Sequence, residues 1–201
     1  MLSYLITAFS GPAAPFMYAL LVIAAFALAV SIERAWTFTT SRCDPDALLR
    51  RVEPAAREGA TIDLGPTPME DVVRAGLAYR DPELAWEAMT AAAIDAELRL
   101  RRRVSYLAVV ASIATMVGLF GTVYGLILAF GAMGDVAAAE RAAQLSEGSA
   151  TAMASTAFGL LVAIPALGAH AVAEATAKEM LAQIERVATR VALALRAGRA
   201  A

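Results

Sequence analysis

Hydroxyl side chains within two long uncharged stretches are the residues of this sequence best suited to handle a proton or an ion. They are Thr115 and Thr122 in residues 107–133, and Thr151, Ser155 and Thr156 in residues 149–173. A hydroxyl donates one hydrogen bond and accepts two, so it can bind a carboxyl group, a water molecule or an ion without carrying a charge. These residues are therefore predicted to line a pore or a proton pathway.

An enzyme active site is not predicted. The hydroxyls have no adjacent base, and the sequence contains no nucleophile elbow, phosphate-binding loop or metal-binding run. The single cysteine, Cys43, and the single histidine, His170, cannot form a structural zinc site. A net charge of −2 also argues against a nucleic-acid partner, because domains that bind phosphate backbones are usually strongly basic. We expect a non-enzymatic protein with no metal or organic cofactor.

Small residues share a helix face with these hydroxyls. At about 100° per residue, Gly118 and Gly125 align with Thr115 and Thr122, while larger apolar side chains cover the opposite side. Residues 149–173 repeat the pattern. Helices in a membrane associate through close backbone contact, which small residues allow, so each face belongs against another helix or along a narrow pore. Helix packing is assigned to Gly118, Gly121, Gly125, Gly159 and Pro165, the last of which lacks a backbone donor and is expected to bend its helix.

Three stretches are long and apolar enough to be membrane-spanning helices, namely residues 16–38, 107–133 and 149–173. The whole chain has 59% hydrophobic residues and a mean hydropathy of +0.60, which is typical of a membrane protein. Near the end of the first stretch lie Glu33, Arg34 and Trp36. We interpret them as an interfacial anchor, in preference to a proton-relay role for Glu33, because paired or snorkelling charges are tolerated at the headgroups.

The segments between and beyond these spans differ in polarity. Residues 1–15 are an uncharged lead-in with glycine and proline, and residues 134–148 are a short loop. Residues 39–106, with ten Arg and twelve acidic residues, are expected to form a water-exposed helical domain, and residues 174–201 a helical tail. Helices are expected at 46–59, 68–79 and 82–106, the last continuing into the second span as one unbroken helix of about 50 residues.

Basic residues are unevenly distributed beside the spans. The 39–106 domain and the tail contain fifteen Lys or Arg, residues 134–148 contain one and residues 1–15 none. Because cytoplasmic segments carry the excess of basic residues, the N-terminus is predicted to be periplasmic and the C-terminus cytoplasmic. Arg99 and Arg101 to Arg103 could also bind membrane lipid headgroups. The predicted fold is an all-α membrane protein with three transmembrane helices and long cytoplasmic helical extensions.

Two motifs on successive spans resemble a known family. GLFGTVYG at residues 118–125 and STAFGLLVAIPA at residues 155–166, with a short acid-containing loop between them, are similar to the MotA/TolQ/ExbB proton-channel family, and to its ExbB/TolQ branch in particular. The three-span layout, the cytoplasmic domain and the helical tail agree with that branch. The resemblance extends over nearly the whole chain and implies a multi-pass protein of the bacterial inner membrane.

The resemblance implies that the chain works with a partner. In the family, a homopentamer encloses a central pore with its second and third spans, and two helices of an ExbD/TolR-like single-span protein stand inside it. An Asp of that partner takes up and releases the coupling ion, which is H⁺ with Na⁺ as the alternative. In the family, the flow of this ion energises import, envelope maintenance or motility, in some cases through a TonB/TolA-like periplasm-spanning protein. Thr122 and Thr156 match the family's pore-facing threonines.

Two positions depart from the ExbB/TolQ pattern. Thr151 stands where the family carries Glu in its GIAEAL segment, and His170 with Ala171 replaces a Tyr-Asn pair. Histidine can carry a proton under physiological conditions, so His170 is a candidate proton exit, the alternative being a residue merely tolerated at the interface. Two other functions stay open, a passive three-span scaffold and a MotA-like flagellar stator subunit. MotA proteins have four spans and a larger cytoplasmic domain, which favours the ExbB/TolQ-like assignment.

Overall fold

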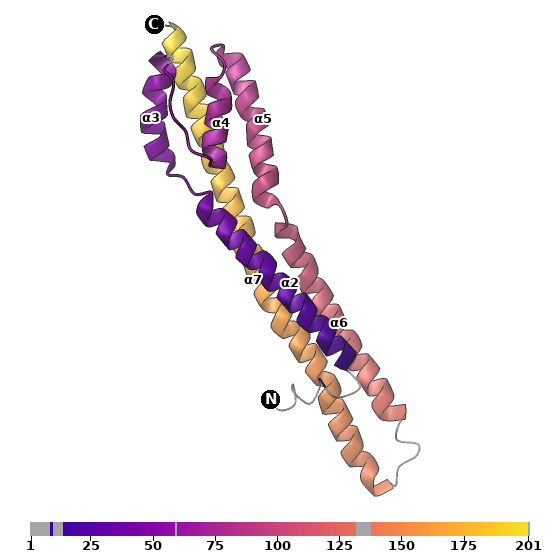
Figure 1. Cartoon of the computed structure of the whole chain (residues 1–201). Helices are drawn as coiled ribbons and strands as arrows, with labels where there is room; N and C mark the ends of the chain where they lie inside the picture. The colour runs from indigo at the N-terminus through magenta and orange to yellow at the C-terminus, as the bar shows by residue number, and fades with distance from the viewer. Residues whose placement is uncertain (1–8, 10–13, 59, 132–137, 201) are drawn as a thin grey trace. The chain divides into compact units, whose positions relative to one another are not determined.

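The computed structural model describes residue 9 and residues 14–58, 60–131 and 138–200, and every regular element in these parts is an α-helix. The helices are α2 (Ala14–Thr40), α3 (Pro45–Glu58), α4 (Pro68–Leu77), α5 (Pro82–Arg101), α6 (Val104–Gly131) and α7 (Ala138–Ala200) (Figure 1). The chain divides into two compact units. We name Met1–Ile32 with Arg103–Ala171 the apolar unit, and Glu33–Arg102 with Val172–Ala201 the polar unit.

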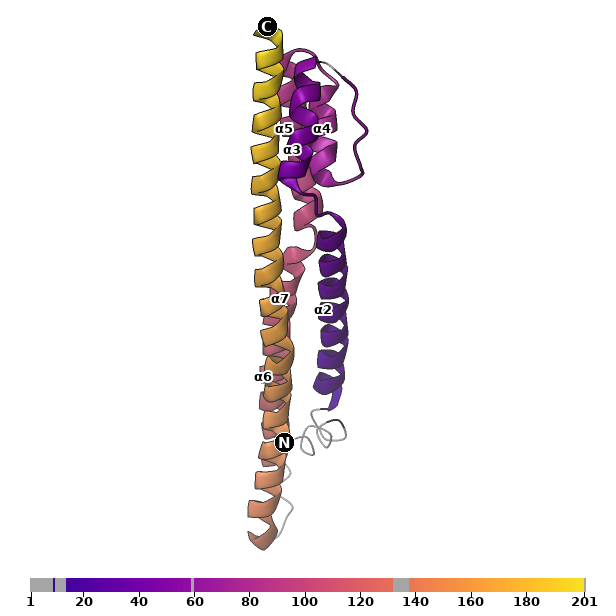
Figure 2. The same ribbon diagram turned by 90° about the vertical axis from the view of Figure 1, so that its left-hand side faces the viewer.

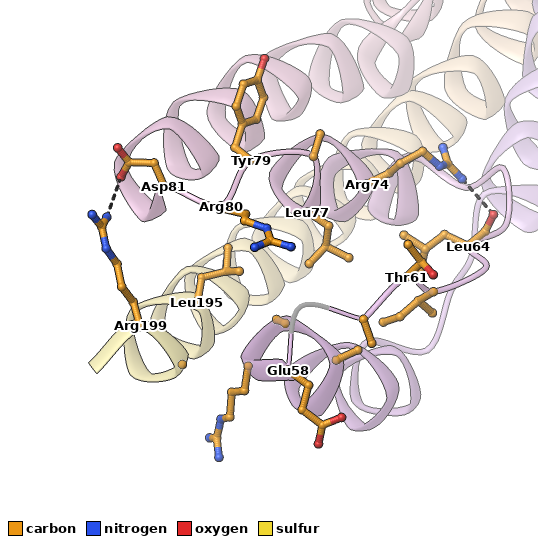
Figure 3. A pocket seen from close by; sticks show the side chains of 17 residues that line it. Glu58, Thr61, Leu64, Arg74, Leu77, Tyr79, Arg80, Asp81, Leu195 and Arg199 are labelled. Carbon is orange, nitrogen blue, oxygen red and sulfur yellow. Dashed lines mark hydrogen bonds and ion pairs between the residues drawn. The ribbon is translucent and has the colours of Figure 1, made fainter. Parts of the chain in front are cut away.

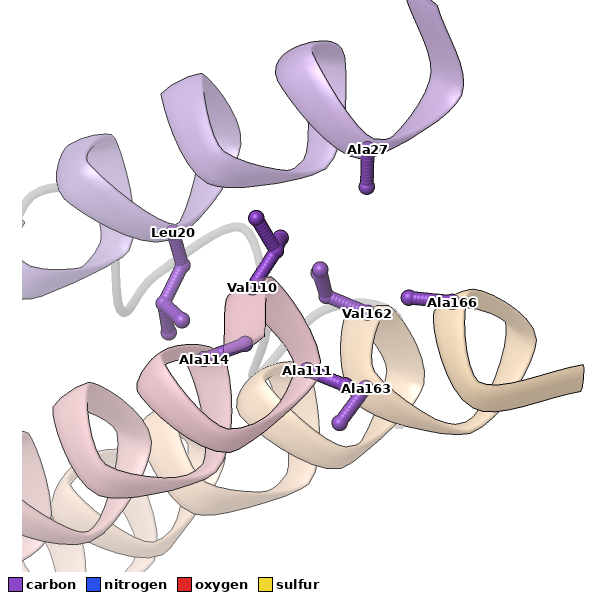
Figure 4. Packing of buried hydrophobic residues seen from close by; sticks show 8 residues of the cluster. All are labelled: Leu20, Ala27, Val110, Ala111, Ala114, Val162, Ala163 and Ala166. Atoms are coloured by element: carbon purple, nitrogen blue, oxygen red, sulfur yellow. The ribbon is translucent and has the colours of Figure 1, made fainter. Parts of the chain in front are cut away.

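Three helices pack together in the apolar unit, namely the first part of α2, all of α6 and the first part of α7 (Figure 2). Their shared core consists of Leu20, Ala27, Val110, Ala111, Ala114, Val162, Ala163 and Ala166 (Figure 4). Five of these eight residues are alanine, whose short side chain lets helix backbones approach closely. The core is therefore thin and depends on backbone proximity rather than on large interlocking side chains.

The outer surface of the apolar unit is also apolar. Large side chains such as Leu21, Phe26, Met116, Ile127 and Leu161 are exposed. Water would penalise an apolar surface of this extent, whereas lipid solvates it. By length and composition, three helical segments are able to cross a membrane, and they include residues 16–38, 107–131 and 149–173 of the predicted spans; residues 132–133 of the second span lie outside the described residues.

The predicted unbroken helix through residues 82–131 is wrong. α5 ends at Arg101 and α6 begins at Val104, and between them Arg102 has φ −53° and ψ 129° and Arg103 has φ 62°. The left-handed conformation of Arg103 costs a non-glycine residue roughly 1–2 kcal/mol. Neither glycine nor proline marks the break, so the local sequence contains no signal for it. The residues on either side of it, Leu100 and Val104, are both fully buried, the first in the polar unit and the second in the apolar unit.

The predicted loop at 134–148 is helical over most of its length. α7 begins at Ala138 and continues without interruption to Ala200, while residues 134–137 lie outside the described residues. Four alanines between residues 138 and 143 favour the helix, because alanine has the highest helix propensity. A Cβ atom added to Gly148 would lie 2.7 Å from Ala129 Cβ, so this early part of α7 already packs against α6.

α3, α4, α5 and the C-terminal part of α7 lie side by side in the polar unit, together with the end of α2 (Figures 1 and 2). Its interior side chains include Leu49, Val73, Met89, Ile184 and Val191. Ion pairs between α7 and α3 join Arg186 to Asp46 and Arg190 to Glu53. Exposed ion pairs contribute little individually, so the buried apolar faces of these helices stabilise the unit.

Glu70 closes a capping box at the start of α4. Its carboxylate accepts hydrogen bonds from the Thr67 hydroxyl at 2.6 Å and from the Thr67 backbone N–H at 3.3 Å. The hydrogen bond from the Thr67 hydroxyl holds the pKa of Glu70 below its ordinary value. The folded chain therefore favours the carboxylate more than the unfolded chain does. This contribution is fully present above the unfolded-state pKa and is lost as the pH falls through the lowered folded-state pKa.

We expect acidification to lower the free energy of unfolding of the wild type more than that of the Glu70→Gln variant. Glutamine keeps an oxygen for the capping box but cannot ionise, so the variant should be about 1 kcal/mol less stable at neutral pH and equal to the wild type in strong acid. Circular-dichroism melting of the chain in detergent, from neutral to strongly acidic pH, measures the difference. Glu83→Gln, which changes an exposed acid in the first turn of α5, is the control. Identical pH responses of the two variants would contradict the assignment.

Candidate functional site

Glycines bring the backbones of α6 and α7 into direct contact. A Cβ atom added to Gly159 would lie 2.7 Å from the Ala114 carbonyl oxygen, and one added to Gly118 would lie 2.9 Å from the Ser155 carbonyl oxygen. Both separations are below 3.0 Å, a distance that real Cβ atoms essentially never cross. No larger residue fits at either position without movement of the backbone. The two glycines therefore set how closely, and in which register, the helices meet.

Two further glycines of α6 lie at tight contacts. A Cβ atom added to Gly121 would meet Ser155 Oγ at 2.9 Å and Phe16 Cβ at 3.0 Å, and one added to Gly125 would meet Ala152 Cβ at 2.8 Å. The structure thus places all four glycines to which the sequence analysis assigned helix packing where α6 and α7 meet.

Phe16 of α2 covers part of this contact, and the sequence analysis did not single it out. Its ring meets the rings of Phe120 and Tyr124 edge-on, with centroids 5.3 Å apart in both cases. Phe120 and Tyr124 are four residues apart and so share a face of α6. That spacing indicates an aromatic face, but it does not identify the partner.

The close contact of α6 with α7 gathers three hydroxyl groups, those of Thr122, Ser155 and Thr156, which we name the hydroxyl cluster. Thr122 Oγ1 lies 3.1 Å from Ser155 Oγ and forms a short hydrogen bond with Thr156 Oγ1. The Gly118 carbonyl oxygen lies within hydrogen-bonding distance of all three hydroxyls, at 3.3 Å from Thr122, 3.0 Å from Ser155 and 3.2 Å from Thr156. The Ala152 carbonyl oxygen lies 3.1 Å from Thr122 Oγ1 and 2.8 Å from Ser155 Oγ.

The hydroxyl cluster has more hydrogen-bond acceptors than donors. Each hydroxyl carries one hydrogen and two lone pairs, so three hydrogens are shared among three hydroxyl oxygens and two carbonyl oxygens. Ser155 is fully buried, whereas Thr122 and Thr156 are partly exposed. The cluster can therefore accept a hydrogen bond from a carboxyl group or water that reaches the two threonines, or present oxygens to a cation.

The other two hydroxyls predicted to line a pathway lie outside the hydroxyl cluster. Thr115 is exposed on α6 and donates to the Ala111 carbonyl oxygen at 3.0 Å. Thr151 is buried on α7 and donates to the Glu147 carbonyl oxygen at 2.9 Å. Each of these hydrogen bonds stays within its own helix. Pro165, the fifth predicted packing residue, lies within α7 and is exposed.

His170 of α7 contacts the first residue of α6. Its Nδ1 lies 3.0 Å from the Val104 carbonyl oxygen, and the side chain is half-buried. Because a carbonyl oxygen only accepts, Nδ1 carries a hydrogen in this arrangement. The contact gives His170 a packing role at the start of α6, and its role as a proton exit stays a prediction.

The residues predicted as an interfacial anchor include a buried arginine. Arg34 is 5% exposed, and it donates to Glu33 Oε1 at 2.9 Å and to the Arg99 carbonyl oxygen at 3.5 Å. Arg99 lies in the last turn of α5, where carbonyl groups lack helical partners and a positive charge is favourable. Trp36 is exposed. Arg34 therefore caps the end of α5, a contact between distant residues that helical periodicity could not indicate.

Membrane-capable helices in backbone contact, with a cluster of three hydroxyl groups at that contact, define a multi-pass helical membrane protein. The described residues contain no group of three His, Cys, Asp or Glu side chains that could hold a metal ion.

The model of the MotA/TolQ/ExbB proton channel family matches residues 65–186, which is more than half of the chain and includes the hydroxyl cluster. The chain belongs to this family, as its motifs predicted. The match does not separate the ExbB/TolQ branch from the others, so the branch stays a prediction. No curated protein matches the chain.

Proposed function

We propose that this chain is the pore-forming subunit of a homopentameric motor driven by the proton motive force. An ExbD/TolR-like single-span protein, as a dimer inside the pore, supplies the ionisable carboxyl group. The hydroxyl cluster carries this proposal, because it offers spare acceptors on two membrane-capable helices whose spans, residues 107–133 and 149–173, contain no acidic side chain. We therefore infer that the carboxyl group at the hydroxyl cluster comes from another chain.

The hydroxyl cluster can serve both protonation states of such a carboxyl group. A protonated carboxyl donates its hydrogen bond to Thr122 Oγ1 or Thr156 Oγ1. After proton release, the carboxylate accepts a hydrogen bond from the same hydroxyl, which rotates to present its hydrogen. The hydroxyls stabilise both states without titrating themselves. The same oxygens can coordinate Na⁺, so the coupling ion is H⁺ with Na⁺ as the alternative, and no enzymatic step or further cofactor is involved.

The proposed setting is the bacterial inner membrane, with the N-terminus in the periplasm and the polar unit and C-terminus in the cytoplasm. The distribution of basic residues supports this orientation. The motor would energise import, envelope maintenance or motility, acting on a TonB/TolA-like periplasm-spanning protein in the first two cases. Three membrane-capable helices in the described residues support an ExbB/TolQ-like subunit over a MotA-like stator subunit, which has four spans.

Native mass spectrometry of the purified chain in mild detergent tests the assembly. We expect a pentamer for the chain alone, and a pentamer carrying two copies of the partner when an ExbD/TolR-like protein with an Asp in its span is co-expressed. The same partner with that Asp changed to Asn is the control, since it should assemble but carry no proton. A monomer or dimer that ignores the partner would contradict the proposal.

A passive structural scaffold is the second candidate function. The observation that favours it is that the hydroxyl cluster also hydrogen-bonds to carbonyl oxygens of its own chain, so its members could serve only to hold α6 against α7. A scaffold of this kind would show no ion flux with any partner, which separates it from the motor.

A further inference from the structure

The polar unit contains a cavity of about 850 Å³ that the motor function does not use (Figure 3). It lies among the end of α3, the segment leading to α4, the turn between α4 and α5, and the last turns of α7. Apolar side chains line much of it, including Ile62, Leu64, Leu77 and Leu195. Its volume is in the range of sites that hold small molecules, which combine an apolar lining with a few polar groups.

The charged residues lining the cavity are mostly basic. Four arginines and two carboxylates contribute, so the lining has a formal charge of +2. Arg199 lies 3.4 Å from Asp81, and that ion pair is exposed. Among the described residues, the Arg80 guanidinium has no hydrogen-bond or ion-pair partner, and Figure 3 shows it over the cavity near Leu77 and Leu195. An anion in the cavity would therefore meet a free guanidinium at Arg80 and a weakly held one at Arg199.

Hydrogen bonds from arginines hold one wall of the cavity in place. The Arg74 guanidinium donates to the carbonyl oxygens of Leu64 at 2.9 Å and Gly65 at 2.6 Å, and Arg51 donates to the Asp63 carbonyl oxygen at 2.8 Å. These contacts fix the segment before α4 without any ligand. A site whose wall is already ordered loses little conformational freedom when a ligand binds.

A glycine fixes the opposite wall. A Cβ atom added to Gly198 would lie 2.6 Å from the Arg57 carbonyl oxygen, so the last turn of α7 contacts the end of α3 directly. This contact brings Leu195 and Arg199, one turn apart on α7, to the edge of the cavity.

We propose that this cavity binds a small phosphate ester with an apolar body, the phosphate lying between Arg80 and Arg199 and the body on the leucine and isoleucine lining. Guanidinium groups bind phosphate oxygens through paired, charge-assisted hydrogen bonds, which makes phosphate the anion that suits two arginines best. The proposed ligand is a soluble ester, and the experiment separates it from a lipid headgroup with the same phosphate chemistry.

Isothermal titration calorimetry of the purified full-length chain in uncharged detergent tests the site, with ADP and phenyl phosphate as probes and adenosine and phenol as their neutral counterparts. We expect both phosphate compounds to bind at millimolar concentration or below and the neutral compounds not to bind. Arg80→Gln should weaken binding about tenfold or more, because it removes a hydrogen bond to a charged group. The variant should fold normally, since Arg80 has no partner to lose.

Arg196→Gln is the matched control, because Arg196 is an exposed arginine of the same part of α7 that does not line the cavity. Its affinity for the probes should equal that of the wild type. Absence of binding by both phosphate compounds, or equal weakening by the two variants, would overturn the proposal. A separate arm compares the full-length chain in phosphatidylglycerol nanodiscs with the chain in phosphatidylcholine nanodiscs, and loss of ADP binding in phosphatidylglycerol alone would overturn the assignment of a soluble ligand.

Discussion

Thr122→Val is expected to abolish proton flux through the proposed complex of this chain with an ExbD/TolR-like partner, while leaving the proposed pentamer intact. Valine has the shape of threonine without the hydroxyl, so the variant removes the group that contacts both Ser155 and Thr156. Interhelical hydrogen bonds in membranes contribute only about 1 kcal/mol each, and the glycine contacts remain, so assembly should survive. The effect on flux should be large, because a partner carboxyl would lose a hydrogen-bonding group at this site.

Proton flux is measured with a pH-sensitive dye in proteoliposomes that contain the complex, and assembly with native mass spectrometry. Thr156→Val should behave like Thr122→Val, and Thr122→Ser, which keeps the hydroxyl, should retain flux. Ser112→Ala is the matched control. Ser112 is an exposed hydroxyl of α6 that bonds only to the Ala108 carbonyl oxygen of its own helix. Normal flux in both valine variants would rule out the hydroxyl cluster as part of the proton pathway.

Gly159→Val is expected to prevent α6 and α7 from packing, with loss of the folded chain as well as of function. The new Cβ atom would meet the Ala114 carbonyl oxygen at 2.7 Å and Gly118 Cα at 3.1 Å, and neither backbone atom can turn aside as a flexible side chain could. Separating the helices would also break the hydrogen bonds that join Thr156 and Ser155 to the Gly118 carbonyl oxygen. We expect a destabilisation of about 3 kcal/mol or more.

Thermal unfolding and size-exclusion chromatography in detergent measure this effect. Gly168→Val is the control, because a Cβ atom at Gly168, on the same helix, meets nothing within 4 Å. Similar melting temperatures for the two variants would show that the close approach of α6 and α7 is not required. Thr122→Val should therefore remove function without disrupting assembly, whereas Gly159→Val should remove both.

The three apolar stretches, the small faces of the second and third stretches, and the family were all predictable from the amino-acid sequence. These features depend on residue composition over about 20 residues and on helical periodicity, and both are properties of neighbouring residues. The family motifs likewise fall within single stretches. For the same reason, Gly118, Gly125 and Gly159 could be assigned to packing faces before their contacts were known.

Which hydroxyls meet could not be predicted without the packing of α6 against α7. Thr122 and Ser155 are 33 positions apart, and their 3.1 Å separation depends on the register that Gly118 and Gly159 set between α6 and α7. Thr115 and Thr151 satisfy the same sequence pattern but bond within their own helices. Periodicity places a residue on a face of its own helix, but it does not determine the rotation or axial position of one helix relative to another.

The break between α5 and α6 was also beyond the sequence. Arg103 adopts a left-handed conformation that local propensity disfavours in any residue but glycine, and Arg34, 65 positions before Arg99, caps the helix end that the break creates. Local preferences indicated a continuous helix. The break and its cap involve contacts between residues distant in the chain, which helix propensity does not describe.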